Sequence, residues 1–149
     1  MNKITLTSDT HFEQLLEAEV ITAYHSSGYP GLVPYPNIHC GDIKQALYRA
    51  DFKMNDEELY DESYIYELEI SLKGLSKELI LDQGHKQDLS FEDFFKKDYN
   101  VLCYKNTAEG DVNKNNLSLI VLNTNNILSM KIHSKWSASE VEKYLFETN

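Results

Sequence analysis

Several features that define common classes of protein are missing or scarce in this sequence. No segment approaches the roughly 18 consecutive apolar residues of a membrane-spanning helix, and the opening residues MNKITLTSDTHF lack the apolar core of a signal peptide. There are two cysteines, Cys40 and Cys103, which lie far apart inside apolar segments and lack the spacing of a metal site. We therefore expect a cytoplasmic protein with buried free thiols, no membrane span and no metal centre.

Basic residues are also scarce. The 149 residues include 14 lysines and arginines against 24 aspartates and glutamates, so the formal net charge is −10. Because phosphate backbones and anionic membranes are bound mainly by lysine and arginine, this balance argues against general affinity for either. It permits a basic protein partner. The length and the ordinary globular composition indicate a single domain over residues 1–149.

Proline and glycine are few, and they are concentrated in one place. All three prolines and two of the six glycines lie between positions 28 and 36. This density excludes a helix or a central strand there. Because proline fixes φ and glycine allows positive φ, the segment predicts a loop of defined shape.

A histidine stands on each side of this loop. His25 follows the apolar residues 20–24, and His39 lies within residues 38–40, so each is expected at or near a strand end. We expect the two side chains to converge on one cleft. The small residues after His25, Ser26-Ser27-Gly28, predict a turn whose backbone N–H groups are open to a ligand.

Periodic patterns predict the surrounding elements. Residues 117–122 are the most apolar segment and predict a central strand, and residues 126–133 predict an edge strand. Apolar and polar residues alternate over residues 64–72, which predicts a strand with Glu67 and Glu69 on its solvated face. Further strands are predicted at residues 3–7, 20–24, 38–40, 79–81 and 100–105, with a turn at 82–84. Helices are predicted at residues 10–19 and 42–50 and from the capping boxes at 90–93 and 137–140. Residues 53–63 and 106–116 predict an acidic and a polar loop.

No nucleophile elbow, P-loop, dinucleotide glycine motif or HExxH is present. The remaining candidates are the histidine pair and the acids Glu109 and Asp111 of the polar loop. Such a set could transfer protons, hold a ligand through imidazole hydrogen bonds, or have no role beyond packing. We expect the other histidines, which are His11, His85 and His133, to be surface residues.

The order of several segments carries a resemblance over residues 20–128. The segments are the strand ending in His25-Ser26-Ser27, then Ile38-His39-Cys40-Gly41-Asp42 with a helix behind it, Tyr64 to Ile70, Tyr104-Lys105-Asn106-x-x-Glu109-Gly110, and Leu119 to Asn123. This succession resembles the ADP-ribosyltransferase superfamily, in particular its small bacterial and bacteriophage members. The resemblance implies an α+β single domain built as a split β-sandwich with flanking helices.

The histidine-tyrosine-glutamate branch of that superfamily implies roles for individual residues. His25 would hydrogen-bond NAD, with Ser26-Ser27 where Gly-Thr is usual, and His39 stands where a tyrosine would stack on nicotinamide. Ser118 occupies the usual position of the acid, so Glu109, with Asp111 in reserve, is taken as the carboxylate that steadies the nicotinamide ribose. The pyrophosphate would use N–H groups from Ser26 to Gly28.

The resemblance implies an NAD-dependent ADP-ribosyltransferase, a glycosyltransferase acting on a macromolecular acceptor. The acidic charge favours a protein acceptor over nucleic acid. A toxin, a defence factor or a phage protein that disables host defence would fit such a small enzyme. Two alternatives stay open: a catalytically silent module whose acidic surface blocks a basic partner, and an NAD glycohydrolase that uses water as acceptor.

Overall fold

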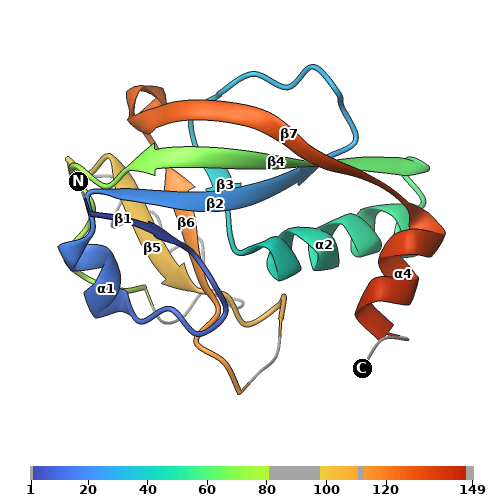
Figure 1. The fold of residues 1–149 in the computed structure, drawn as a ribbon, viewed down its shortest axis with the longest axis horizontal. Helices are drawn as coiled ribbons and strands as arrows, with labels where there is room; N and C mark the ends of the chain where they lie inside the picture. Colours follow the sequence, from blue (N-terminus) through green and yellow to red (C-terminus); the bar gives the residue numbers. More distant parts are fainter. Residues whose placement is uncertain (1, 81–97, 111–112, 147–149) are drawn as a thin grey trace.

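A computed structural model describes residues 2–80, 98–110 and 113–146 of the chain (Figure 1). These residues form an α+β fold in which two β-sheets pack together and helices lie at the ends of the first sheet. The predicted turn at 82–84, the helix predicted from residue 90, His85 and Asp111 lie outside the described residues.

The first sheet has four strands in the order β1-β2-β4-β7. Their bounds are Lys3–Thr5 for β1, Val20–Ser27 for β2, Glu62–Ser71 for β4 and Ile127–Ser137 for β7. Strand β1 runs parallel to β2, and the other neighbours are antiparallel. The edge position predicted for the strand beginning near residue 126 is confirmed, although β7 is longer than predicted.

The second sheet has three antiparallel strands in the order β3-β6-β5. Their bounds are Ile38–Cys40 for β3, Val101–Lys105 for β5 and Leu117–Val121 for β6. All residues of β6 are buried, so the prediction of a central strand from its continuous apolar pattern is confirmed. The strand predicted at residues 79–81 is reduced, in its described part, to a single bridge between Ile80 and Tyr104.

Alternation along β4 divides the core. Tyr66, Leu68 and Ile70 point toward the second sheet and join a cluster with its strands. Ile65 points to the other face and packs with residues of the helices, which are Leu47, Ala50, Val141 and Leu145. The intervening Glu67 and Glu69 pair with Lys131 and Lys3 at 3.4 and 3.0 Å, so they serve sheet-surface ion pairs.

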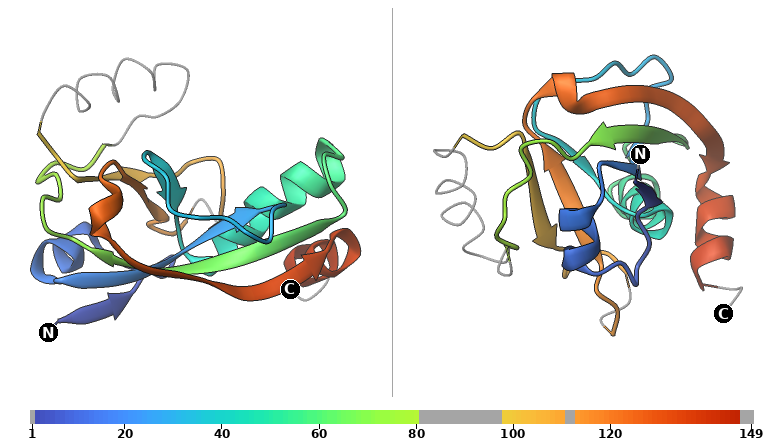
Figure 2. Two further views of the ribbon diagram at one scale, coloured as in Figure 1. Left: turned by 90° about the horizontal axis from the view of Figure 1, so that it is seen from above. Right: turned by 60° about the vertical axis from the view of Figure 1, so that its left-hand side comes forward.

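The helices lie at opposite ends of the first sheet. Helix α1 covers Phe12–Glu17 near one end, and α2 (Ile43–Asp51) and α4 (Ala138–Phe146) lie together at the other (Figure 2). A short 3-10 turn, η2, covers Thr124–Asn126. The caps predicted for α2 and α4 are confirmed. The Asp42 carboxylate accepts from the Gln45 N–H at 2.9 Å, and the Ser137 hydroxyl accepts from the Glu140 N–H at 3.2 Å.

Two helix boundaries differ from the prediction. The capping box predicted at residues 10–13 is wrong, because the Thr10 hydroxyl accepts from the Thr7 N–H at 2.9 Å and closes a turn before the helix. The box lies one residue later, where the His11 N–H donates to Gln14 Oε1 at 2.8 Å. The predicted acidic loop at 53–63 is wrong over its first residues, because Phe52–Asp56 forms a π-helical turn, η1, that buries Met54.

Candidate functional site

A cleft of about 1090 Å³ opens between the two sheets and helix α2. The sequence-predicted residues that line it are His25, Ser26, Ser27, Gly28, His39 and Glu109. The expectation that His25 and His39 converge on one cleft is therefore confirmed. Their roles toward NAD stay predictions.

The cleft exists because β2 changes partners along its length. Strand β1 pairs with β2 only as far as Thr22, and beyond it the two sheets are joined by one bridge between Tyr24 and Gly41, with N···O distances of 2.7 and 2.9 Å. After this bridge the edge of β2 is open on the side of β3. Because backbone groups alternate along a strand, the N–H of Ser26 faces the same edge as that of Tyr24.

The predicted turn at residues 26–28 begins later than expected. Ser26 and Ser27 belong to β2 and pair with Ile65 and Tyr64 of β4, since the partner strand extends far enough to hold them. Gly28 follows, and its lack of a side chain is used by Tyr60, because an added Cβ would lie 2.5 Å from the ring. Residues 26–28 therefore do not form a free turn with all of its N–H groups exposed. The N–H groups that can reach a ligand are those on the open edge of β2.

His25 is held as a neutral imidazole. Its Nδ1–H donates to the carbonyl oxygen of His39 at 2.6 Å, and the Tyr35 hydroxyl lies 3.3 Å from Nε2. Burial lowers the pKa of His25, and the positive charge of Arg49 lowers it further, while the bond to His39 opposes the shift. The result is a ring of fixed orientation with Nε2 as the acceptor.

His39 lies on β3, and its side chain contacts β5 of the same sheet. Its Nδ1 shares a hydrogen bond of 3.1 Å with the Tyr104 hydroxyl, and the two rings meet edge to face with centroids 5.8 Å apart. Partial burial, followed by the charges of His25 and Arg49, lowers the pKa of His39. Both histidines of the cleft are therefore neutral at physiological pH.

The Pro/Gly loop has the defined shape that its composition predicts. The Tyr66 hydroxyl, which comes from β4, donates to the carbonyl oxygen of Tyr29 and accepts from the Leu32 N–H at 3.1 Å. These bonds pin the loop from inside and leave Tyr35 at the cleft, next to His25. No pattern in the sequence predicted Tyr35 as a cleft residue.

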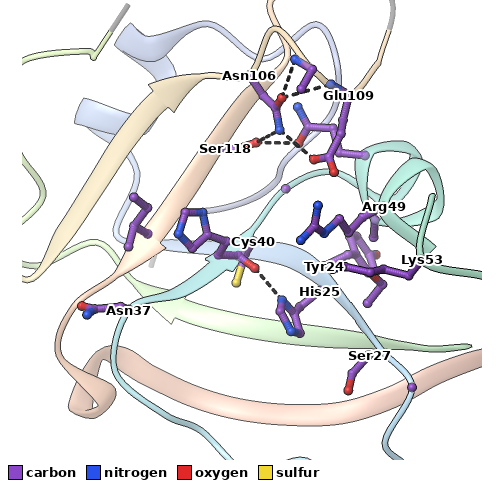
Figure 3. Close-up of a pocket in the computed structure, with 18 of the residues that line it drawn as sticks. Tyr24, His25, Ser27, Asn37, Cys40, Arg49, Lys53, Asn106, Glu109 and Ser118 are labelled. Carbon is purple, nitrogen blue, oxygen red and sulfur yellow. Dashed lines mark hydrogen bonds between the residues drawn. The ribbon is translucent and has the colours of Figure 1, made fainter. Parts of the chain in front are cut away.

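Helix α2 and the turn η1 that follows it supply the positive charge of the cleft. Arg49 and Lys53 both line it, and Figure 3 shows Arg49 extending from the helix into the space between His25 and Glu109. Lys53 pairs with Glu57 at 2.9 Å, whereas Arg49 makes no ion pair with any residue that the structure describes. Gln45, Arg49 and Lys53 follow one another at four-residue spacing, which is the signal that could have assigned this helix face to the cleft.

Glu109 reaches the cleft from the loop between β5 and β6. The Asn106 amide donates to Glu109 Oε1 at 2.8 Å, as Figure 3 shows. Burial raises the pKa of Glu109, while Asn106 and Arg49 oppose that rise. Ser118, at the position where the resemblance places an acid, is buried beneath this contact.

The cleft offers no thiol nucleophile. Cys40 lines its wall, but complete burial raises the pKa of this thiol to about 12, so it stays protonated. Both cysteines are buried and free, as predicted. Among the described residues, no three histidine, cysteine or acidic side chains lie close enough to hold a metal ion.

Comparison of the chain with protein-family models, with curated proteins and with solved structures found no match. Within the described ranges, no helix has the length and apolar character needed to cross a bilayer. The residues of the cleft are therefore the basis for assigning a function.

Proposed function

We propose that the chain is an NAD-dependent ADP-ribosyltransferase that acts on a macromolecular acceptor, and that its fold is the split β-sandwich of that superfamily. One observation carries the proposal: a single cleft brings together two neutral imidazoles, an arginine without an ion pair among the described residues, and a half-buried carboxylate. His25, His39 and Glu109 follow one another along the chain in the order that the resemblance implies.

The cleft suits a dinucleotide in size and charge. Its volume of about 1090 Å³ lies just above the roughly 300–1,000 Å³ of typical small-molecule sites, which leaves room for a ligand as large as a dinucleotide. Arg49 and the open edge of β2 at Ser26 supply donors for a pyrophosphate on a chain whose net charge is −10. His39 and Tyr35 supply flat rings for a nicotinamide.

Each residue has a role that follows from its chemistry. NAD, when bound, supplies ADP-ribose as the transferred group and nicotinamide as the leaving group. His25 orients the ligand through a ring that the His39 carbonyl already holds in place. Glu109 stabilises the positive charge that develops at the ribose only in the transition state, as in glycoside hydrolysis. The leaving nitrogen takes the electrons of the broken bond, and the acceptor bonds to the ribose carbon and releases its proton to solvent.

The surface beside the cleft fits a basic protein acceptor. Leu59 and Tyr60 line the cleft, and they belong to a segment that also carries five acids, Asp56, Glu57, Glu58, Asp61 and Glu62. Acidic side chains attract basic partners and repel phosphate backbones. We therefore expect a protein segment rich in lysine or arginine as the acceptor.

The proposal is tested by calorimetric titration of NAD into the wild-type chain and two variants, with nicotinamide release followed in the same samples. We expect His25→Ala to abolish detectable binding. Glu109→Gln should bind NAD within a few-fold of wild type and release nicotinamide about 100- to 1,000-fold more slowly. His11→Ala is the matched control, because His11 is exposed and outside the cleft lining.

The outcomes separate the three alternatives. A folded wild-type chain that binds no NAD overturns the proposal and supports the silent acidic module. Nicotinamide release that is as fast without any protein acceptor as with one, and without a labelled acceptor, supports the glycohydrolase. Nicotinamide release that depends on Glu109, together with transfer of labelled ADP-ribose to a basic protein, supports the transferase.

A further inference from the structure

Glu109 stands on a loop, yet its carboxylate is tied to the rigid part of the fold. The tie is the side chain of Asn106, which is 5% exposed at the end of β5. Its Nδ2 donates to Glu109 Oε1 at 2.8 Å and to Ser118 Oγ at 3.2 Å, and its Oδ1 accepts from the N–H groups of Ala108 and Glu109, both at 3.0 Å. These contacts match the two hydrogens and two lone pairs of a carboxamide.

The contact with Ser118 continues into helix α2. The Ser118 hydroxyl donates to Gln45 Oε1 at 3.0 Å, and the same oxygen accepts from the Asp42 N–H at 3.0 Å. Asp42 in turn caps the helix through the Gln45 N–H. Gln45, Ser118 and Asn106 are each at least 95% buried. The loop acid is therefore anchored, through buried amides and one hydroxyl, to the start of the helix that carries Arg49.

We propose that Asn106 is the positioning residue of this site: it fixes the Glu109 carboxylate over Ser118, and Ser118 and Gln45 hold Asn106 in place. This inference rests on the proposed function. It accounts for the serine at the position where the resemblance places an acid, because Asn106 donates to both Ser118 and Glu109 and so brings the carboxylate to that wall of the cleft. A catalytic carboxylate needs such a support, since small displacements weaken electrostatic stabilisation steeply.

The sharpest test is Asn106→Asp. Aspartate keeps the acceptor that shapes the turn at Ala108 and Glu109 but removes both N–H donors, and it adds a like charge beside Glu109. We expect nicotinamide release to fall about 100-fold in kcat, as for a displaced catalytic group, with the Kd for NAD within about threefold of wild type. The acid limb of the pH profile should also move to higher pH, because the donor to Glu109 is lost.

The matched control is Asn123→Asp. Asn123 is exposed, and its side chain also accepts from a backbone N–H in a turn, that of Asn125 at 2.9 Å. This change alters the net charge equally, away from the cleft, and we expect wild-type kinetics. Ser118→Ala is the second variant if Asn106→Asp does not fold. It removes the support beneath Asn106 and should lower kcat about three- to tenfold without weakening NAD binding.

The outcomes distinguish this inference from the proposed function. A wild-type chain that neither binds NAD nor releases nicotinamide overturns both. An active wild-type chain whose activity needs Glu109, but which tolerates the Asn106 and Ser118 changes within threefold, overturns only the inference. Loss of kcat with retained Kd supports it, because a merely structural disturbance of the cleft would weaken NAD binding as well. The shifted acid limb counts only together with that result, since the aspartate also places a charge beside Glu109.

Discussion

Arg49→Gln tests whether the positive wall of the cleft binds an anionic ligand. Arg49 lines the cleft and makes no ion pair with the described residues, so its guanidinium is available to a phosphate. A hydrogen bond to a charged group contributes about 1.5–3 kcal/mol, and because Arg49 is exposed, water screening places it near the lower end. With about 1.4 kcal/mol per tenfold, Arg49→Gln should weaken binding of a pyrophosphate ligand about tenfold.

The assay is calorimetric titration with ADP-ribose and with adenosine, which shares the base and ribose but lacks the phosphates. We expect the tenfold loss for ADP-ribose and an unchanged affinity for adenosine. Lys53→Gln is the matched control from the adjoining turn η1, which also lines the cleft. Because Lys53 is already paired with Glu57 at 2.9 Å, this change should weaken binding by less than about threefold. The ADP-ribose affinity of the wild-type chain should also fall as salt is added.

An Arg49→Gln variant that binds ADP-ribose within twofold of wild type would refute this assignment. Equal losses for ADP-ribose and adenosine would also refute it, because they would show that the substitution damages the cleft as a whole. If Lys53→Gln weakened ADP-ribose binding more than Arg49→Gln does, Lys53 would be the residue that binds the phosphates. That result would contradict the expectation drawn from its ion pair with Glu57.

Three further outcomes are expected. Because burial raises the pKa of Glu109 and its ionised form is the active one, nicotinamide release should be lost as pH falls through a value above the ordinary range of a glutamate. An acid limb of kcat/KM at or below that range would contradict this. In urea unfolding, Asp42→Ala should lower the free energy of unfolding by about 1–2 kcal/mol and Ser137→Ala by about 0.5–1 kcal/mol, because the Asp42 cap is buried and the Ser137 cap is partly exposed. A larger loss for Ser137→Ala would show that burial does not decide the strength of these caps. Gly28→Ala should destabilise by about 1–3 kcal/mol through a clash with Tyr60, and Tyr60→Leu should relieve most of that loss in the double variant; simple additivity would show that the clash is not the cause.

Much of the fold could be predicted from local pattern. The continuous apolar segment gave the buried central strand β6, and the polar residue before an apolar period gave the caps at Asp42 and Ser137. These features depend on neighbours within about four residues, which the sequence displays directly. The boundary errors have tertiary causes. Strand β2 extends through Ser27 because β4 is long enough to pair with it. The turn η1 forms because it buries the side chain of Met54 in the core.

The candidate site also has features that the local sequence predicts and features that depend on tertiary contacts. The concentration of proline and glycine between two histidines indicated a shaped loop and a cleft, and the structure has both. Gln45 and Asn106 could not be assigned to the site from the sequence, because their roles depend on hydrogen bonds to residues far along the chain. A buried amide is recognised only when its partners are known, whereas a helix cap is recognised from the next turn of chain.

The sequence by itself determined the residue types available for chemistry: two histidines, one nearby arginine and an acid on a polar loop, on a chain of net charge −10. It also determined the strands and helices that carry them, through periodicity and capping. Only the tertiary structure decided that Glu109 is directed into the cleft. Asn106 contacts Ser118 across 12 positions, and Ser118 contacts Gln45 across 73, so the orientation of the acid follows from hydrogen bonds that join the second sheet to the start of helix α2. Local sequence preference cannot encode contacts that exist only after the core has formed.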